Sequence, residues 1–296
     1  KVSQLVRNQY EENPYPRWIN TGLSDKPKTT RQLLQSVNPH LNFDVQQFSN
    51  KPDILVAGCG TGQHALSVAS RFRNCNVLAI DLSLTSLSYA KRKTQELGIK
   101  NIEYMQGDIL KLNQLEREFD IVESVGVVHH MDDPLAGWKI LVGKLRPGGV
   151  MRIGLYSEIA RQSIANARRE IAKKEYTSSP DDIRRYRGEI MNMDTKSDPK
   201  ISKIKTFNDF FTLSECRDLL FHVQEHRFTL PQIEVALNDL SLKFLGFELE
   251  KSWIRSEFRE LYPEKDAAVS LPLWHQFELK NPNIFKGMYQ FWVEKA

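Results

Sequence analysis

Three closely spaced glycines mark the first segment that could carry chemistry. Gly58, Gly60 and Gly62 follow the apolar run Asp53–Ala57, at the point where a buried strand would turn into a helix. Glycine permits backbone angles that other residues avoid and lets a ligand approach the main chain, while the helix N-terminus beyond it offers free amides. A dinucleotide site favours G-x-G-x-x-G, but Gln63 occupies the last position of that pattern. The spacing therefore argues against a nicotinamide dinucleotide.

Two acidic side chains follow the next two apolar runs. Asp81 comes directly after Asn76–Ile80, where its carboxylate could accept both hydroxyls of a ribose; alternatively it could cap the helix that begins near Ser83. Gly107 and Asp108 follow the third run, where the carboxylate could accept an adenine amino group or serve as a turn or cap residue. Because open α/β sheets bind ligands at the carboxyl ends of their strands, the three elements together predict one nucleoside site.

The elements that must position these residues alternate along residues 51–157. Most of the apolar runs are rich in Val, Ile or Leu, as expected for parallel strands buried on both faces. This alternation predicts βαβ units with right-handed crossovers and an open, doubly wound sheet. The predicted strands are Asp53–Ala57, Asn76–Ile80, Asn101–Met105, Phe119–Ser124 and Gly149–Leu155. The predicted helical stretches are Gly62–Phe72, Ser83–Leu97, a turn near Leu110–Leu115, and Pro134–Leu145.

With these residues in place, the sequence resembles the class I methyltransferases that use S-adenosylmethionine (SAM). Asp53–Gly62 is similar to their glycine-rich motif, Asp81 to their ribose-binding acid, and Gly107-Asp108 to their adenine-contacting pair. The resemblance covers residues 51–157 closely and implies an α/β, Rossmann-like, doubly wound seven-stranded sheet, SAM as cofactor, and methyl transfer to a nucleophile. It implies cofactor contacts by Gly58, Cys59, Gly60, Gly62, Gln63, Asp81, Leu82, Gly107, Asp108, Ile109, Ser124 and Val125.

Two segments outside the core carry a narrower resemblance. Residues 9–18 and 219–228 are similar to segments of bacterial methyltransferases fused to tetratricopeptide repeats and of rickettsial protein-lysine methyltransferases. The chain itself shows no repeat, so such a partner would lie upstream of Lys1. The alternative to an enzyme is a non-catalytic SAM-binding or scaffold domain within a larger repeat-containing protein.

The order of the predicted elements divides the chain into four parts. They are an N-terminal helical and aromatic arm (1–50), a SAM-binding core (51–157), a helical insertion (158–229) and the completion of the core sheet (230–296). In the last part, Leu242–Leu249 and Gly287–Val293 are predicted to form a closing antiparallel hairpin, with only irregular structure between them. The insertion shows two apolar stripes that are too narrow to bury themselves. We therefore expect it to pack over the sheet as a cap on the acceptor site, or to form a homodimer.

Histidines are the candidate catalytic groups, because some acceptors must lose a proton before they attack. His129 and His130 follow the fourth strand and could act as a base or merely shape the loop. His222 and His226 are four residues apart, which predicts one helix face in a substrate pocket or an interface. With Glu225 they match the letters H-x-x-E-H, but no third ligand is visible, so no metal site is predicted.

The leader from Tyr10 to Trp18 combines aromatic residues with two prolines. It could form a lid over the methionine end of the cofactor, with an arginine paired to the SAM carboxylate, or an arm that fills a groove of the core. The substrate candidates are Tyr10, Tyr15, Arg17, Trp18, Tyr156, His222 and His226.

Composition limits the partners. The net charge of +4 is mild, and neither a nucleic acid nor a membrane is an expected partner. Residues 158–206 hold 12 Lys and Arg against 8 Asp and Glu, which indicates a solvated helical face or an anionic partner. The three cysteines show no metal or C-x-x-C spacing and suit a reduced, cytoplasmic compartment. A small molecule and a protein side chain both remain open as the methyl acceptor.

Overall fold

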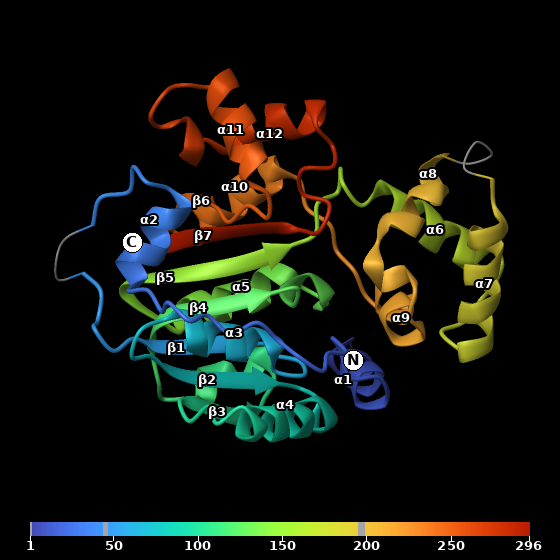
Figure 1. Cartoon of the computed structure of the whole chain (residues 1–296), viewed down its shortest axis with the longest axis horizontal. Helices are drawn as coiled ribbons and strands as arrows, with labels where there is room; N and C mark the ends of the chain where they lie inside the picture. Colours follow the sequence, from blue (N-terminus) through green and yellow to red (C-terminus); the bar gives the residue numbers. More distant parts are fainter. Residues whose placement is uncertain (1, 44–46, 195–198) are drawn as a thin grey trace.

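The computed structural model, which describes residues 2–43, 47–194 and 199–296, confirms the predicted fold class (Figure 1). In the described part a seven-stranded sheet has the order β3-β2-β1-β4-β5-β7-β6. The first five strands in sequence pair in parallel, whereas β7 is antiparallel to both β5 and β6 and forms the closing hairpin. The strands are β1 (Asp53–Ala57), β2 (Asn76–Asp81), β3 (Ile102–Gln106), β4 (Phe119–Val125), β5 (Leu145–Leu155), β6 (Leu242–Phe247) and β7 (Tyr289–Lys295).

Helices surround the sheet and form a separate group beside it (Figure 1). The α-helices are α1 (Val2–Glu12), α2 (Thr30–Val37), α3 (Gln63–Arg71), α4 (Leu84–Glu96), α5 (Pro134–Gly143), α6 (Gln162–Lys173), α7 (Pro180–Asn192), α8 (Pro199–Ser202), α9 (Leu213–Phe221), α10 (Leu230–Asp239), α11 (Ser252–Leu261) and α12 (Leu271–Lys280). The 3-10 turns are η1 (Ile109–Gln114), η2 (Val128–His130), η3 (Lys203–Thr206), η4 (Asn208–Phe210) and η5 (Ala267–Val269).

The segment between β6 and β7 corrects one prediction. We expected irregular structure there, but α11 and α12 occupy it. Pro272 lies in the first turn of α12, where the missing amide is not needed, and Ser270 caps that helix by accepting from the amide of Leu273. The proline therefore marks a helix start in the segment that was expected to be irregular.

Two apolar layers enclose the sheet because neighbouring strand residues point to opposite faces. In β1, Leu55 packs in the core that also contains Trp138 of α5 and Trp274 of α12. Ile54 packs in the opposite core with residues of α2, α3 and α4. The carboxyl ends of the parallel strands are thereby fixed at one edge, and this edge faces α1 and α9 (Figure 1).

The helical insertion contains its own apolar core, which corrects the prediction that its stripes require the sheet or another subunit. Ile164 of α6, Ile190 of α7 and Leu219 of α9 pack together with Phe210. The two stripes face each other and a third helix, so they bury one another. A homodimer through the insertion stays a prediction.

Within residues 2–43, 47–194 and 199–296, no helix combines the length and the apolar character needed to cross a bilayer.

Candidate cofactor and acceptor site

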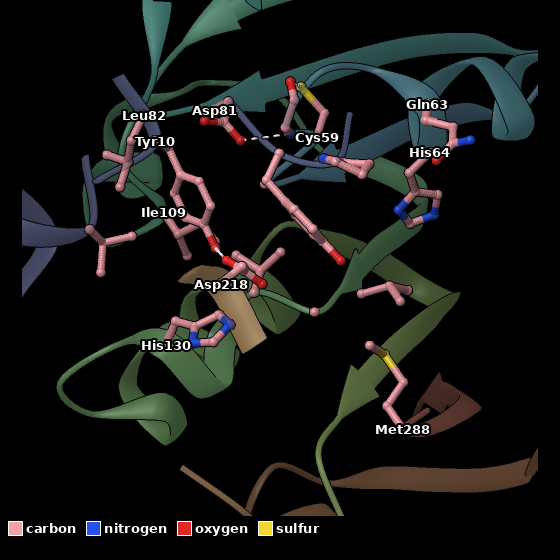
Figure 2. Close-up of a pocket in the computed structure, with 18 of the residues that line it drawn as sticks. Tyr10, Cys59, Gln63, His64, Asp81, Leu82, Ile109, His130, Asp218 and Met288 are labelled. Carbon is pink, nitrogen blue, oxygen red and sulfur yellow. Dashed lines mark hydrogen bonds between the residues drawn. The ribbon is translucent and has the colours of Figure 1, made fainter. Parts of the chain in front are cut away.

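A cavity of about 620 Å³ opens at the carboxyl ends of the parallel strands (Figure 2). Its size lies within the range of about 300–1,000 Å³ that small-molecule sites occupy. Its walls come from the loops after β1 to β5, from α3, β5 and the start of β7, from the N-terminal arm with α1, and from α9 of the insertion. The cavity is therefore completed by segments far apart in the sequence.

Close packing explains why glycines follow β1. Gly60 has a φ of +52°, and a Cβ there would lie 2.5 Å from the carbonyl oxygen of Tyr15. A Cβ on Gly58 would lie 2.4 Å from the side chain of Val127. Gly58 and Gly60 line the cavity, whereas Gly62 does not. The loop thus holds the N-terminal arm and the loop after β4 against the cavity.

Asp81 lies at the end of β2, and its two carboxylate oxygens accept hydrogen bonds from the glycine loop and from the start of α4. Its Oδ2 accepts from the amide of Gly60 at 2.8 Å and its Oδ1 from the amide of Ser83 at 2.9 Å. Burial raises the pKa of this carboxyl above its usual value, opposed by these amides. The cap of α4 is Ser83, so the capping alternative for Asp81 is wrong.

Asp81 also keeps the capacity that a ribose would need. A carboxylate can accept about four hydrogen bonds, and each oxygen uses one on the main chain. The remaining lone pairs lie in the wall of the cavity, so this residue fits a nucleoside diol.

The predicted cofactor residues divide into two groups. Asp108 caps η1, where it accepts from the amide of Leu110 at 2.9 Å, and it also lines the cavity, so the cap is confirmed and the adenine contact stays a prediction. Ser124 and Gly62 do not line the cavity. The predicted residues that do line it are Gly58, Cys59, Gly60, Gln63, Asp81, Leu82, Gly107, Asp108, Ile109 and Val125.

The N-terminal arm covers the glycine loop. The amide of Thr61 donates to the carbonyl of Tyr15 at 3.3 Å, and its hydroxyl donates to the carbonyl of Pro16 at 2.6 Å. Trp18 donates from its ring nitrogen to the same hydroxyl at 3.0 Å. Tyr15, like Tyr10 of α1, lines the cavity, but Trp18 does not.

Arg17 corrects one prediction about the arm. Its side chain is exposed and lies outside the cavity wall, so the structure does not support its pairing with a SAM carboxylate. The arginine that lines the cavity is Arg152 of β5.

The wall opposite the glycine loop joins α1 to the insertion. Tyr10 donates its hydroxyl to Oδ1 of Asp218, on α9, at 2.8 Å (Figure 2). The same hydroxyl oxygen lies 3.2 Å from Nε2 of His222, whose Nδ1 accepts from the amide of Gln224 at 3.1 Å. A neutral imidazole carries one N–H, so Nε2 of His222 holds it and donates to Tyr10.

His130 is the second histidine of this wall. Its Nδ1 lies 2.6 Å from the carbonyl oxygen of Gln224, which can only accept, so Nδ1 is protonated and Nε2 is free. The rings of His130 and His222 stack with centroids 3.7 Å apart. Burial lowers the pKa of His130 to about 4 and that of His222 to about 2. Both rings are therefore neutral at physiological pH.

Asp218 is the ionisable group of this wall that titrates near neutrality. Burial raises the pKa of its carboxyl to about 7, opposed by the hydrogen bond from Tyr10 and supported by the nearby carboxylate of Asp209. Only 8% of the residue is exposed. A buried carboxyl with such a pKa can exchange a proton at physiological pH.

The structure corrects the predictions for three of the histidines. His129 is fully buried, packs against the ring of Tyr156 at a tilt of 36° and does not line the cavity. Because α9 ends at Phe221, His222 and His226 do not share a helix face. Gln224 separates them and bonds to both. His226 lines another surface groove.

In the described part of the chain no group of three or more metal-ligating side chains gathers. Tyr156, the remaining substrate candidate, lines the cavity. The guanidinium of Arg161 lies 3.5 Å from its ring centroid.

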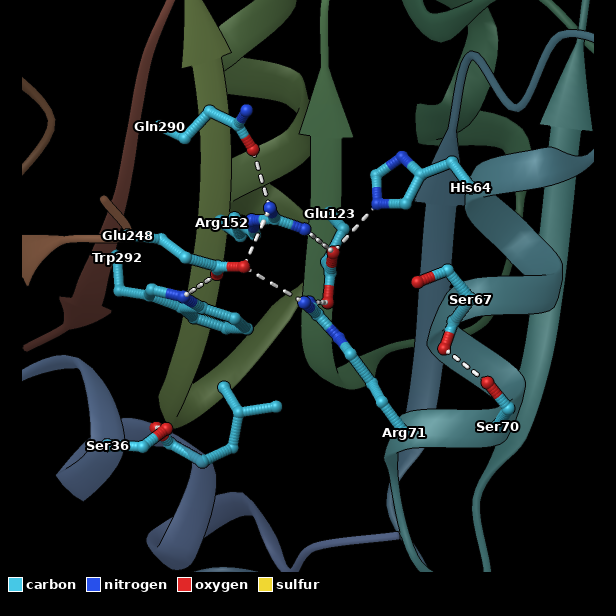
Figure 3. Close-up of polar contacts among 11 residues, drawn as sticks. Ser36, His64, Ser67, Ser70, Arg71, Glu123, Arg152, Glu248, Gln290 and Trp292 are labelled. Atoms are coloured by element: carbon cyan, nitrogen blue, oxygen red, sulfur yellow. Dashed lines mark hydrogen bonds and ion pairs between the residues drawn. The ribbon is translucent and has the colours of Figure 1, made fainter. Parts of the chain in front are cut away.

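A buried charge cluster beside the cavity was missed by the sequence analysis (Figure 3). Glu123 of β4 is fully buried and pairs with Arg71 of α3, with Arg152 at 3.2 Å and with His64 at 2.8 Å. The two arginines and the hydrogen bond with His64 hold the pKa of Glu123 far below its usual value despite burial. His64 and Arg152 also line the cavity. Glu123 and its partners come from three elements, α3, β4 and β5, so no local motif could indicate the cluster.

Comparisons with known proteins agree with this geometry. Residues 54–149 match the family model described as a methyltransferase domain. A Synechococcus protein described as uncharacterized is 30% identical over 247 residues, which cover 79% of this chain and 58% of that protein. A ubiquinone biosynthesis O-methyltransferase of Acinetobacter baumannii is 32% identical over 97 residues, or 32% of this chain and 40% of that enzyme.

Among solved structures, PKMT2 from Rickettsia typhi in complex with AdoHcy superposes with a TM-score of 0.68 at 16% identity. The match covers 96% of this chain and 55% of that one, and it shows a shared fold. The chain thus spans little more than half the length of this protein and of the Synechococcus relative. A fused repeat domain stays a prediction.

The strand order, the cavity and the family match define the class of protein. The chain contains a SAM-dependent methyltransferase domain with the class I fold, and SAM is its cofactor.

Proposed function

We propose that this chain transfers the methyl group of SAM to an amine nitrogen of an acceptor bound between the sheet edge and α9. The observation that carries the proposal is the presence of two acids in the wall of one cavity, one of them, Asp218, buried. Asp81 lies on the cofactor side and Asp218 on the side of the insertion. The first suits a ribose and the second suits a cation.

The cofactor would lie along the strand ends. Asp81 would accept the ribose hydroxyls, and Asp108 with the apolar side chains of Leu82 and Ile109 would hold the adenine. Gly58, Gly60 and the first residues of α3 would contact the methionine end. SAM supplies a methyl group already activated by its sulfonium, so the protein has to align a nucleophile and exclude water.

The chemistry of the opposite wall favours an amine. Tyr10, Tyr15 and Tyr156 surround the carboxylate of Asp218 with aromatic rings, and aromatic faces attract cations. The buried guanidinium of Arg161, which interacts with Asp218 electrostatically, is already paired with Glu225 at 2.9 Å. The negative charge of Asp218 is therefore left for a ligand.

In the proposed reaction the acceptor nitrogen, freed of one proton, forms a bond to the methyl carbon. The carbon–sulfur bond breaks and its electron pair stays on sulfur, which gives neutral S-adenosylhomocysteine (AdoHcy) and a methylated ammonium. An acceptor amine could come from a lysine side chain of a protein or from a small metabolite. The shared fold with PKMT2 and the resemblance of residues 9–18 and 219–228 to lysine methyltransferases support the first source.

Labelled SAM distinguishes these sources. We would incubate the protein with SAM carrying a deuterated methyl group and, in parallel, with lysine-containing protein extracts and with a panel of small primary amines, and locate the label by mass spectrometry. Label on nitrogen in either arm supports the proposal and identifies the source. Label on oxygen, sulfur or carbon would overturn it. Binding of SAM without label transfer in any arm would support a non-catalytic binding domain in its place.

A further inference from the structure

We propose that Asp218 receives the proton that the acceptor ammonium loses before methyl transfer, and that Tyr10 and His222 hold its carboxylate in position. This assignment rests on the proposed function and names the residue that completes it. Asp218 comes from the insertion, Tyr10 from the N-terminal arm and His222 from the end of α9. The proton acceptor is thus built only when all three segments meet.

The hydrogen bonds around Asp218 have one direction. The amide of Gln224 donates to His222, His222 donates to Tyr10, and Tyr10 donates to Oδ1 of Asp218. Each donor N–H or O–H in this series is used in one hydrogen bond, and the last bond ends on the carboxylate of Asp218. No protein hydrogen bond from the described residues is made to Oδ2 of Asp218, and the side chain lies in the cavity wall. That oxygen is free to accept an ammonium N–H.

The other side chains of the wall are poorer proton acceptors. His130 presents a free Nε2 to the cavity, but its pKa of about 4 leaves it a weak base at neutral pH. The hydroxyls of Tyr10 and Tyr156 are donors at neutral pH because burial raises their pKa. A general base works best when its pKa lies near the operating pH, and in this wall Asp218 meets that condition.

The arginines near Asp218 have other partners and do not neutralise its carboxylate. Arg161 is paired with Glu225, and Arg168 donates to the carbonyl of His222 at 2.7 Å. Asp209 opposes ionisation of Asp218, and Arg161 favours it. The groups that face Asp218 are Tyr10 of α1, Tyr15 of the arm, Tyr156 after β5, Arg161 before α6, Arg168 of α6, Asp209 of η4 and Glu225 after α9.

The proton transfer is balanced within the site. One N–H bond of the acceptor ammonium breaks, and one O–H bond forms on Asp218. The pair changes from ammonium and carboxylate to amine and carboxylic acid, with no change in net charge. The amine lone pair is then free to attack, and Asp218 releases its proton to solvent after the product leaves.

A SAM analogue tests the assignment without a known acceptor. Sinefungin carries an amine-bearing carbon in place of the methyl-bearing sulfonium, so its ammonium occupies the position of the transferred methyl. Calorimetry would give the ratio of the AdoHcy and sinefungin dissociation constants. For the wild type we expect this ratio to rise about tenfold from pH 6 to pH 8, as a carboxyl with a pKa of about 7 ionises.

Three variants make the result specific. Asp218→Asn should remove both the preference for sinefungin and its pH dependence while AdoHcy affinity stays within about threefold of wild type. Tyr10→Phe removes a donor that favours the charged carboxylate, so the rise should move to higher pH. Asp181→Asn changes an exposed aspartate of the same insertion, 94% accessible at its side chain, and should behave as wild type.

The outcomes separate the two proposals. A ratio in Asp218→Asn that equals the wild-type ratio, with AdoHcy still bound, would overturn the role of Asp218 alone. If Asp218→Asn does not fold, an unchanged pH midpoint in Tyr10→Phe would do the same. A wild-type protein that binds neither AdoHcy nor sinefungin would overturn the proposed function and, with it, this assignment.

Discussion

At the scale of single residues, the site depends on groups whose positions lower the stability of the fold. Asp218 is a carboxyl that is only 8% exposed. Gly60 lets the carbonyl oxygen of Tyr15 lie where a Cβ would otherwise stand. Such positions lower the free energy of unfolding but serve binding or catalysis. Substitutions that separate stability from binding can test both residues.

Gly60→Ala should disrupt the site more than a positive φ alone explains. The new Cβ would lie 2.5 Å from the carbonyl oxygen of Tyr15, so the arm must shift as well as the loop. Gly148 is the matched control, because it also has a positive φ but open space around it. We expect Gly148→Ala to cost about 1–2 kcal/mol of unfolding free energy and to leave AdoHcy affinity unchanged. Gly60→Ala should cost more and weaken AdoHcy binding at least tenfold; equal effects in both variants would contradict this.

Asp218 should also make stability depend on pH. Its pKa of about 7 in the folded protein exceeds the value of about 4 in an unfolded chain. Between these values the folded state holds a proton that the unfolded state has lost, so stability contributed by this group falls as pH rises through that window. Denaturant unfolding should show the wild type losing stability relative to Asp218→Asn by up to about 1.4 kcal/mol per pH unit from pH 4 to pH 7. A difference that does not vary with pH would argue against a titrating Asp218.

At the scale of elements, α1 forms part of the cavity wall and joins α4 to the insertion. Its Ser3, Val6 and Tyr10 line the cavity. Glu11 holds it to the N-terminus of α4 by accepting from the amides of Leu84 and Thr85 at 2.8 and 3.0 Å. The hydroxyl of Thr85 leads the interactions that lower the pKa of Glu11 to about 2. The helix should therefore have to loosen before the cofactor leaves.

Glu11→Ala tests this role of α1. Loss of the three bonds to α4 should release α1 and speed AdoHcy dissociation several-fold, with a smaller effect on association. Stopped-flow displacement would measure both rates. Glu96→Ala removes an exposed glutamate at the far end of α4, where it pairs with Lys93, and should leave both rates unchanged. Equal dissociation rates in the wild type and Glu11→Ala would show that α1 is not a barrier to release.

Local sequence patterns could predict some of these elements and not others. The alternation of β1 to β5 with helices, and the positions of Asp81 and Asp108 at strand ends, follow from short-range periodicity. Asp218 could not be found this way, because its partner Tyr10 is 208 residues away and no local spacing indicates the contact. The four-residue spacing of His222 and His226 does not place them on one helix face, because the helix ends at Phe221.

At the scale of the whole molecule, three apolar cores support one cavity, two on the faces of the sheet and one in the insertion. The sheet and its covering helices hold the glycine loop, Asp81 and Asp108, while the insertion holds Asp218 on a core of its own. The two sides of the cavity should therefore respond differently when one core is weakened.

Ile190→Ala would create a cavity in the core of the insertion, where this side chain is fully buried. We expect a loss of about 2–5 kcal/mol in the stability of that core. Hydrogen exchange should rise in α6, α7 and α9 and stay low in β1, β4 and β5, and AdoHcy affinity should fall less than the sinefungin preference. Uniformly raised exchange across the sheet would show that the sheet and the insertion unfold as one.

The central claim is that the strand ends bind SAM through Asp81, and calorimetric titration of SAM tests it most directly. The wild type should bind SAM, and Asp81→Ala should weaken binding by about 1.5–3 kcal/mol, the value of a hydrogen bond to a charged group. Asp181→Ala, on the exposed face of α7, should bind as the wild type does. A wild-type protein that fails to bind SAM, or an Asp81→Ala variant that binds it equally well, would contradict the account.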